Sequence, residues 1–158
     1  MDIAVHWGMI SAVYPFWFNI ARLTGRLLGL QSQVTQVQII NRLKEQYGDR
    51  QTVSRYARFV IRSFVAWGVL RDSNGKGCYE KAVPVIISDN SIAILMIESA
   101  LHASPEGKVA LNLMINNPAF FPFHIPVMTG DFIAQNNDRI NVVRYGLDDE
   151  LIKLNGCQ

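Results

Sequence analysis

The pattern of apolar and polar positions is most regular from Thr52 to Gly68, in the stretch TVSRYARFVIRSFVAWG. At about 100° per residue, its apolar side chains fall within one broad arc of a helical wheel: Val53, Ala57, Val60, Ile61 and Phe64. Its arginines fall together on the opposite side: Arg55, Arg58 and Arg62. The pattern therefore predicts a helix with one face in the core and a stripe of arginines on the other.

The polar face of this helix has three guanidinium groups and no carboxylate. A surface helix usually mixes both signs, because like charges three or four positions apart repel each other. The repulsion costs about a few tenths of a kcal/mol per pair unless an anion lies in front of the arginines. The first interpretation is an anionic partner, most simply a nucleic-acid backbone. A solvated basic face without a partner is the alternative.

Two helices are predicted ahead of the arginine-bearing one. Apolar residues recur at spacings of three and four after Pro15, a good first helical residue, and predict a helix that ends near Leu30. A Thr-x-x-Gln pattern at Thr35 is a capping box that opens a second helix, and Gly48 supplies its stop. We expect Thr52 to cap the arginine-bearing helix.

A β-hairpin is predicted directly after the arginine-bearing helix. Residues 69–71 form an extended segment, and Asn74-Gly75 is a strong signal for a tight hairpin turn. Residues 78–81 return as the partner strand. Lys76 is then expected at the tip of the hairpin.

With this order of elements, residues 15–87 resemble the winged helix-turn-helix superfamily: a recognition helix ends in Trp-Gly-Val-Leu and runs straight into the wing. The resemblance implies that the third helix enters the major groove of DNA and that the wing touches the flanking backbone. The expected fold class is mainly α with a small β-hairpin (α+β), followed by a helical C-terminal extension that ends in a strand. The expected domains are residues 1–87, with an N-terminal helix, and residues 88–158, which either pack on the first or form a degenerate second winged unit.

The C-terminal region is predicted to begin with two helices. Ser88 or Asp89 can cap a helix over residues 92–103 that is apolar on nearly every side. Such a helix must be buried, either in the core or in a homodimer seam over residues 92–101. Ser104 is expected to open another helix, to about residue 116.

Residues 118–138 alternate prolines with aromatic residues, which prevents a long helix. The pattern predicts an aromatic plug over the core, formed by Phe120, Phe121 and Phe123. Thr129 is expected to start a short helix. Residues 140–145 alternate as a strand, and a turn and a short apolar tail follow.

Composition describes an ordinary globular chain of 158 residues, with 49% hydrophobic and 18% charged residues. The net charge is +2, but residues 1–81 carry a balance of +6 and the remainder −4, which suggests that one half faces an anion. Cys78 and Cys157 lie far apart without other metal ligands nearby, and we expect reduced thiols in a cytoplasmic protein. The apolar stretch from Ile3 to Ala21 is too interrupted for a membrane span.

No catalytic constellation is evident. His6, His102 and His124 are widely separated, and none lies at metal-ligand spacing. The acidic group at residues 148–150 suggests a metal-dependent nuclease as a minor alternative, but adjacent carboxylates more often form a solvated turn. We therefore expect no enzyme activity, no metal and no cofactor.

The leading hypothesis is a double-stranded DNA-binding protein, either a transcription regulator or a component of a DNA-acting complex. Arg55 and Arg58 are expected to reach the groove, because arginine pairs bidentately with guanine. The other expected contacts, to phosphate or base edges, come from Arg50, Thr52, Ser54, Arg62 and Lys76. Helix-turn-helix proteins usually act as dimers, which favours the seam over residues 92–101. A protein-interaction module with an acidic partner is the second hypothesis, and an enzyme is the weakest.

Overall fold

The structure, a computed structural model, describes residues 2–156 and shows a mixed α+β protein. The chain divides into two compact units. The central unit consists of residues 19–85 and 118–123, and the terminal unit contains residues 2–18, 86–117 and 124–156. This grouping differs from a division at residue 87, because the first helix joins the later part of the chain. Cys157, one of the two cysteines, lies outside the described residues.

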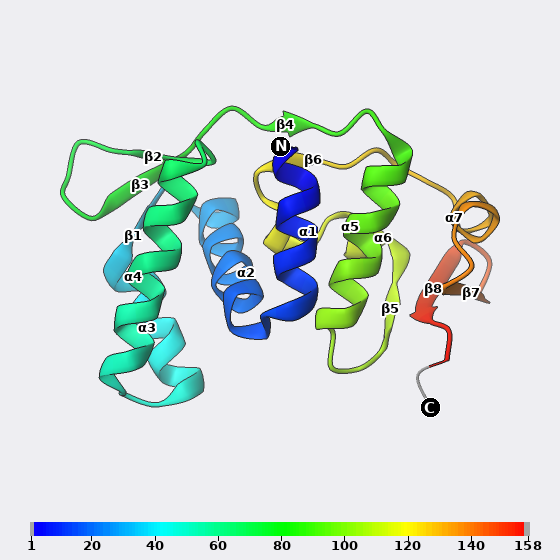
Figure 1. Cartoon of the computed structure of the whole chain (residues 1–158), viewed down its shortest axis with the longest axis horizontal. Helices are drawn as coiled ribbons and strands as arrows, with labels where there is room; N and C mark the ends of the chain where they lie inside the picture. The colour runs from blue at the N-terminus through cyan, green and yellow to red at the C-terminus, as the bar shows by residue number, and fades with distance from the viewer. Residues whose placement is uncertain (1, 157–158) are drawn as a thin grey trace. The chain divides into compact units, whose positions relative to one another are not determined.

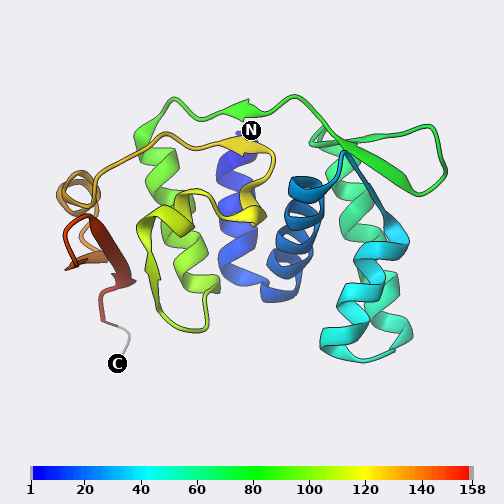
Figure 2. The same cartoon turned by 180° about the vertical axis from the view of Figure 1, so that it is seen from behind.

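The central unit holds the predicted helices and hairpin (Figures 1 and 2). Its elements, in chain order, are most of α2 (Pro15–Leu30), β1 (Gln33–Thr35), α3 (Gln36–Tyr47), α4 (Gln51–Ala66), β2 (Leu70–Asp72), β3 (Cys78–Lys81) and the 3₁₀ helix η1 (Pro118–Phe120). The three strands form an antiparallel sheet in the order β1-β3-β2. A short strand ahead of α3 is therefore added to the predicted hairpin.

The helix boundaries in the central unit follow local signals with one exception. α2 spans the predicted residues, and α3 begins with the predicted capping box, in which Thr35 and Gln38 satisfy each other's backbone N–H groups. Gly48 ends α3 at a positive φ of 83°. The cap predicted at Thr52 is wrong: the N–H of Arg50 donates to the carbonyl of Gly48, which leaves Arg50 extended as the N-cap and Thr52 inside the first turn.

The hairpin has the predicted strands but a different turn. Leu70 lies opposite Lys81, and Asp72 lies opposite Tyr79. The N–H of Cys78 donates to the carbonyl of Gly75, and Gly77 has a φ of 74°. The left-handed residue of the turn is therefore Gly77 and not Asn74, as in a type II turn.

The core of the central unit is completed by residues 118–123, which return to pack on α2. The predicted aromatic plug is confirmed in that Phe120, Phe121 and Phe123 are buried. Phe121 packs edge-to-face on Phe64 of α4, with ring centroids 5.8 Å apart. Gly25 on α2 allows the approach, because a Cβ there would lie 1.8 Å from the carbonyl oxygen of Pro118.

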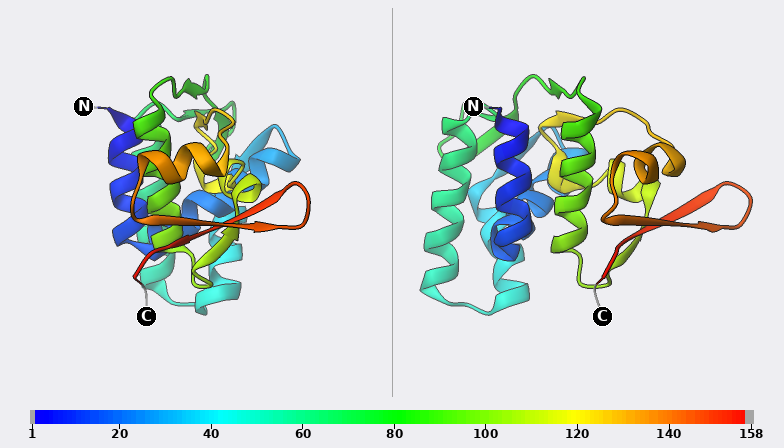
Figure 3. Two further views of the ribbon diagram at one scale, coloured as in Figure 1. Left: turned by 90° about the vertical axis from the view of Figure 1, so that its right-hand side faces the viewer. Right: turned by 45° about the vertical axis from the view of Figure 1, so that its right-hand side comes forward.

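The terminal unit combines helices with a second antiparallel sheet (Figure 3). The elements that lie in it wholly or partly are α1 (Ile3–Val13), β4 (Val85–Ile86), α5 (Asn90–Ala103), β5 (Lys108–Ala110), α6 (Leu111–Ile115), β6 (Phe123–His124), α7 (Gly130–Asn136), β7 (Ile140–Tyr145) and β8 (Asp149–Leu154). The sheet order is β5-β8-β7. Asp89 caps α5 and Thr129 caps α7.

α1 and α5 lie side by side in the terminal unit (Figure 1). Trp7 of α1 is fully buried, and its ring packs edge-to-face on Trp17 at 4.6 Å. Most of the apolar residues of α5 are buried in the same chain, and Ile92 and Leu95 are half-buried. The buried ones are Ala93, Ile94, Met96, Ile97, Ala100 and Leu101. The homodimer seam expected over residues 92–101 is therefore wrong, because these side chains form core.

Two elements of the terminal unit differ from the predictions. Residues 104–107 form a turn and not a helix, because Ser104 is extended at the end of α5 and Gly107 has a φ of 66°. The short helix α6 follows only after β5. The expected apolar tail is β8, since its residues from Asp149 to Leu154 pair with β7.

If the two-residue strand β6 between α6 and α7 is left aside, both units contain the same order of elements: helix, strand, helix, helix and two hairpin strands. The order is α2-β1-α3-α4-β2-β3 in the central unit and α5-β5-α6-α7-β7-β8 among the elements of the terminal unit. In each sheet the last strand lies between the other two. Among residues 2–156, no helix is both long and apolar enough to cross a membrane.

Candidate nucleic-acid interface

The helix α4 has the two faces that its sequence predicts. Its inner side chains are buried in the central unit: Val53, Ala57, Ile61 and Phe64. Arg55, Arg58 and Arg62 are exposed on the outer face. No Asp or Glu occurs anywhere in α4, so any compensation of this charge must come from other elements.

Arg55 and Arg58 remain uncompensated by acidic side chains. Within residues 2–156 neither forms an ion pair, and both line a hollow of about 580 Å³ where α3 turns into α4. The hollow also contains Lys44, Asp49 and Ser54. Asp49 is already paired with Lys44 at 3.0 Å. The two guanidinium groups therefore present positive charge at an open, polar concavity.

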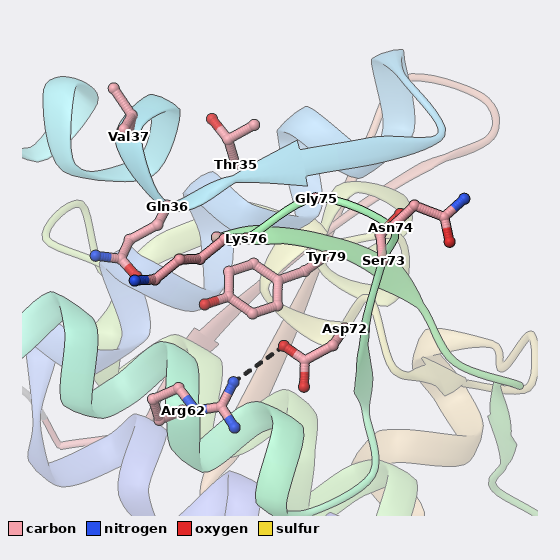
Figure 4. Close-up of a pocket in the computed structure, with 11 residues that line it drawn as sticks. Thr35, Gln36, Val37, Arg62, Asp72, Ser73, Asn74, Gly75, Lys76 and Tyr79 are labelled. Carbon is pink, nitrogen blue, oxygen red and sulfur yellow. Dashed lines mark hydrogen bonds and ion pairs between the residues drawn. The ribbon is translucent and has the colours of Figure 1, made fainter.

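Arg62 has a different environment from the other two arginines. Its guanidinium donates to the carboxylate of Asp72 at 3.0 Å, which joins α4 to β2 (Figure 4). The pKa of Arg62 is raised, first by a hydrogen bond to the Tyr79 side chain and then by Asp72. Arg62 thus ties the hairpin to α4, and its charge is partly neutralised.

A second concavity of about 720 Å³ lies between α4, the hairpin and the start of α3 (Figure 4). Its lining includes Gln36 and the ring of Tyr79, with the exposed Lys76 at the turn. Arg62 and Asp72 also line it. The hairpin therefore brings the ammonium group of Lys76 to the concavity that Arg62 also lines.

The structure brings some of the predicted site residues together and leaves others outside. Ser54 joins Arg55 and Arg58 at the first concavity, and Lys76 joins Arg62 at the second. Arg50 and Thr52 are exposed at the start of α4 but line neither concavity.

Two aromatic residues on the outer face of α4 are absent from the sequence-based prediction. Tyr56 is 59% exposed and Phe59 is 60% exposed. The guanidinium carbon of Arg55 lies 5.9 Å from the centre of the Phe59 ring, a cation–π distance. Their position on the helical wheel could have indicated this exposure, because both residues fall outside the apolar arc.

The metal-dependent nuclease suggested by residues 148–150 has no metal site in the part of the chain that the structure describes. Asp148 and Asp149 are exposed at the turn and first strand residue of the β7–β8 hairpin. Across residues 2–156, no group of His, Cys, Asp and Glu is arranged to hold a metal ion. His102 lies 4.0 Å from Glu98, whose carboxylate is bound by Arg139 and Asn137. The carboxylate of Glu98 is therefore held by neighbouring side chains, which indicates a structural role for this residue.

Comparison of the chain with models of protein families, with curated proteins and with solved structures finds no match. The assignment of function therefore depends on the geometry and charge of the residues themselves.

Proposed function

We propose that this protein binds double-stranded DNA through α4 and the β2–β3 hairpin, as a winged helix-turn-helix module of a transcription regulator or a DNA-acting complex. The observation that carries the proposal is the pair of exposed arginines, Arg55 and Arg58, which form no ion pair with the acidic residues of the described part of the chain. The order α2-β1-α3-α4-β2-β3 and the strand order β1-β3-β2 support the winged interpretation. We also predict from the sequence that the protein has no enzyme activity and that it is cytoplasmic.

The charges in the central unit suit a polyanion. Uncompensated guanidinium groups repel each other, and phosphate oxygens offset that repulsion with strong charge-assisted hydrogen bonds. Arg55 and Arg58 carry guanidinium groups, which pair bidentately with guanine O6 and N7 at the edge of the major groove. Arg50 and Lys76, exposed on either side of them in sequence, are assigned to backbone phosphates. Arg62 serves chiefly to position the hairpin.

Salt dependence of binding is the first test. Fluorescence anisotropy would follow binding of the full chain to a labelled mixed-sequence duplex between 50 and 200 mM salt, about the range over which such contacts are lost. The two phosphate contacts assigned to Arg50 and Lys76 predict a slope of about −1.8 in a plot of log affinity against log salt concentration, and the slope steepens to about −3.6 if the charges of Arg55 and Arg58 also neutralise phosphates. A flat plot would contradict the proposal.

Charge reversal locates the interface. Arg58→Glu is expected to lower the affinity at least about tenfold, since it converts a charge-assisted contact into a repulsion. Lys108→Glu makes the same change of charge at an exposed position in the terminal unit and is expected to leave the affinity nearly unchanged. If the double variant Arg55→Glu and Arg58→Glu binds like the original protein, α4 is not the interface.

An acidic protein partner is the second candidate, and the exposed Tyr56 and Phe59 favour it. Tyr, Phe and Arg are enriched at the centres of protein–protein interfaces. If the purified protein ignores DNA at every salt concentration but elutes from an extract with one stable partner, and Arg58→Glu removes that partner, this function replaces the first.

A further inference from the structure

Of the two exposed aromatic residues on α4, Phe59 lies directly beside the arginine face, whereas Tyr56 lies further round toward the apolar face. Phe59 is four positions after Arg55 and three positions before Arg62, so all three share one side of the helix. The ring of Phe59 is 60% exposed, although burial of a phenyl group is favourable. An apolar partner in front of α4 would remove this surface from water.

We propose that Phe59 determines base specificity by packing on the 5-methyl group of a thymine in the major groove. This inference rests on the proposed function. The thymine methyl is the one apolar group that the base edges offer in the major groove, while the other positions are hydrogen-bond donors or acceptors. A helix that carries both arginine and an exposed phenyl ring therefore matches a groove containing guanine and thymine.

The contact between Arg55 and Phe59 prearranges the two side chains. The guanidinium lies 5.9 Å from the ring centre, so each group restricts the rotamers of the other before DNA arrives. Four residues advance about 6 Å along a helix, and base pairs are spaced by about 3.4 Å. Arg55 and Phe59 can therefore meet bases within about two steps of each other, which predicts a thymine within about two base pairs of a contacted guanine.

Replacement of thymine by uracil isolates the proposed contact, because it removes the methyl group and leaves the Watson–Crick pairing. Duplexes that bind the full chain would first be selected from a random-sequence pool. Each thymine of a selected duplex would then be replaced by uracil in turn. The loss of one buried methyl predicts about a fourfold weaker affinity at one or two thymines and no change elsewhere.

Protein variants assign the effect to Phe59. In Phe59→Ala, the sensitive thymine and its uracil replacement are expected to bind equally well. Tyr145→Ala removes a ring that is 66% exposed on β7 in the terminal unit and should retain the fourfold difference. Circular dichroism checks that each variant is folded. We expect both to fold, because the two rings are exposed and their removal leaves no cavity in the core.

The possible results separate this inference from the proposed function. The inference is overturned if every uracil duplex binds like its thymine counterpart, or if Phe59→Ala still distinguishes them. It is also overturned if a single strand binds more tightly than the duplex, because the rings then stack on unpaired bases. If the original protein binds no duplex at all, the proposed function fails together with the inference.

Discussion

Substitution of Gly25 by Ala tests how residues 118–123 complete the central unit. A Cβ at Gly25 would lie 1.8 Å from the carbonyl oxygen and 2.6 Å from the carbonyl carbon of Pro118. Both atoms are backbone, at the start of η1, so they cannot yield by a change of rotamer. Overpacking of a core lowers the free energy of unfolding by about 1–3 kcal/mol. Because the obstacle here is backbone, we expect Gly25→Ala to lie at the upper end, at about 3 kcal/mol. For a protein of this length, that corresponds to a fall in Tm of about 6–12 °C.

Gly29 supplies the matched control on the same helix. It is exposed, and beyond its own stretch of helix no described atom lies within 4 Å of the position that a Cβ would take. Gly29→Ala is therefore expected to stabilise the protein by about 0.5 kcal/mol, because alanine loses less backbone entropy in a helix. Urea unfolding followed by tryptophan fluorescence would compare the two variants. Equal unfolding midpoints for Gly25→Ala and Gly29→Ala would refute the proposed packing.

Two further predictions concern local geometry in the central unit. Gly77→Ala is expected to destabilise the hairpin by about 1–2 kcal/mol, because the φ of 74° strains any residue with a Cβ, whereas Gly75→Ala should cost less. Thr35→Ala is expected to cost about 1 kcal/mol through loss of the bond to the N–H of Gln38, and Thr35→Ser should recover most of it. Urea unfolding measures both, and an inverted order within either pair would contradict the assignment.

Local signals account for what the sequence predicts correctly. α2 from Pro15 to Leu30 and α3 with its capping box depend on residues close together in the chain. The strand β7 likewise follows from the β-branched and partly alternating residues 140–145. Thr52 shows the limit of such signals, because a good capping residue loses its role when the helix begins two residues earlier, with Arg50 as the N-cap.

Most of the elements and contacts that the sequence does not predict are formed by pairing between segments far apart in the chain. β1 and β5 are three residues long, and each becomes a strand by pairing with a hairpin strand far along the chain: Gln33 with Glu80, and Lys108 with Lys153. The packing of α1 on α5 has the same origin. In the candidate site, charge could be located from the sequence, but neither the Asp72 partner of Arg62 nor the exposure of Phe59 could be.

The repeated order of elements allows the charge of corresponding helices and hairpins in the two units to be compared. α4 spans 16 residues and carries three arginines, whereas α7, in the same place in the order, spans 7 residues and begins with Gly130-Asp131. The nearby Arg144 is paired with Asp131 at 3.0 Å, and the β7–β8 hairpin carries acidic residues where β2–β3 carries Lys76. A phosphate backbone would be attracted by the first helix and hairpin and repelled by the second pair. The two units therefore differ in the charge of the corresponding helix and hairpin, and the proposed DNA-binding surface belongs to the more basic of the two, the central unit.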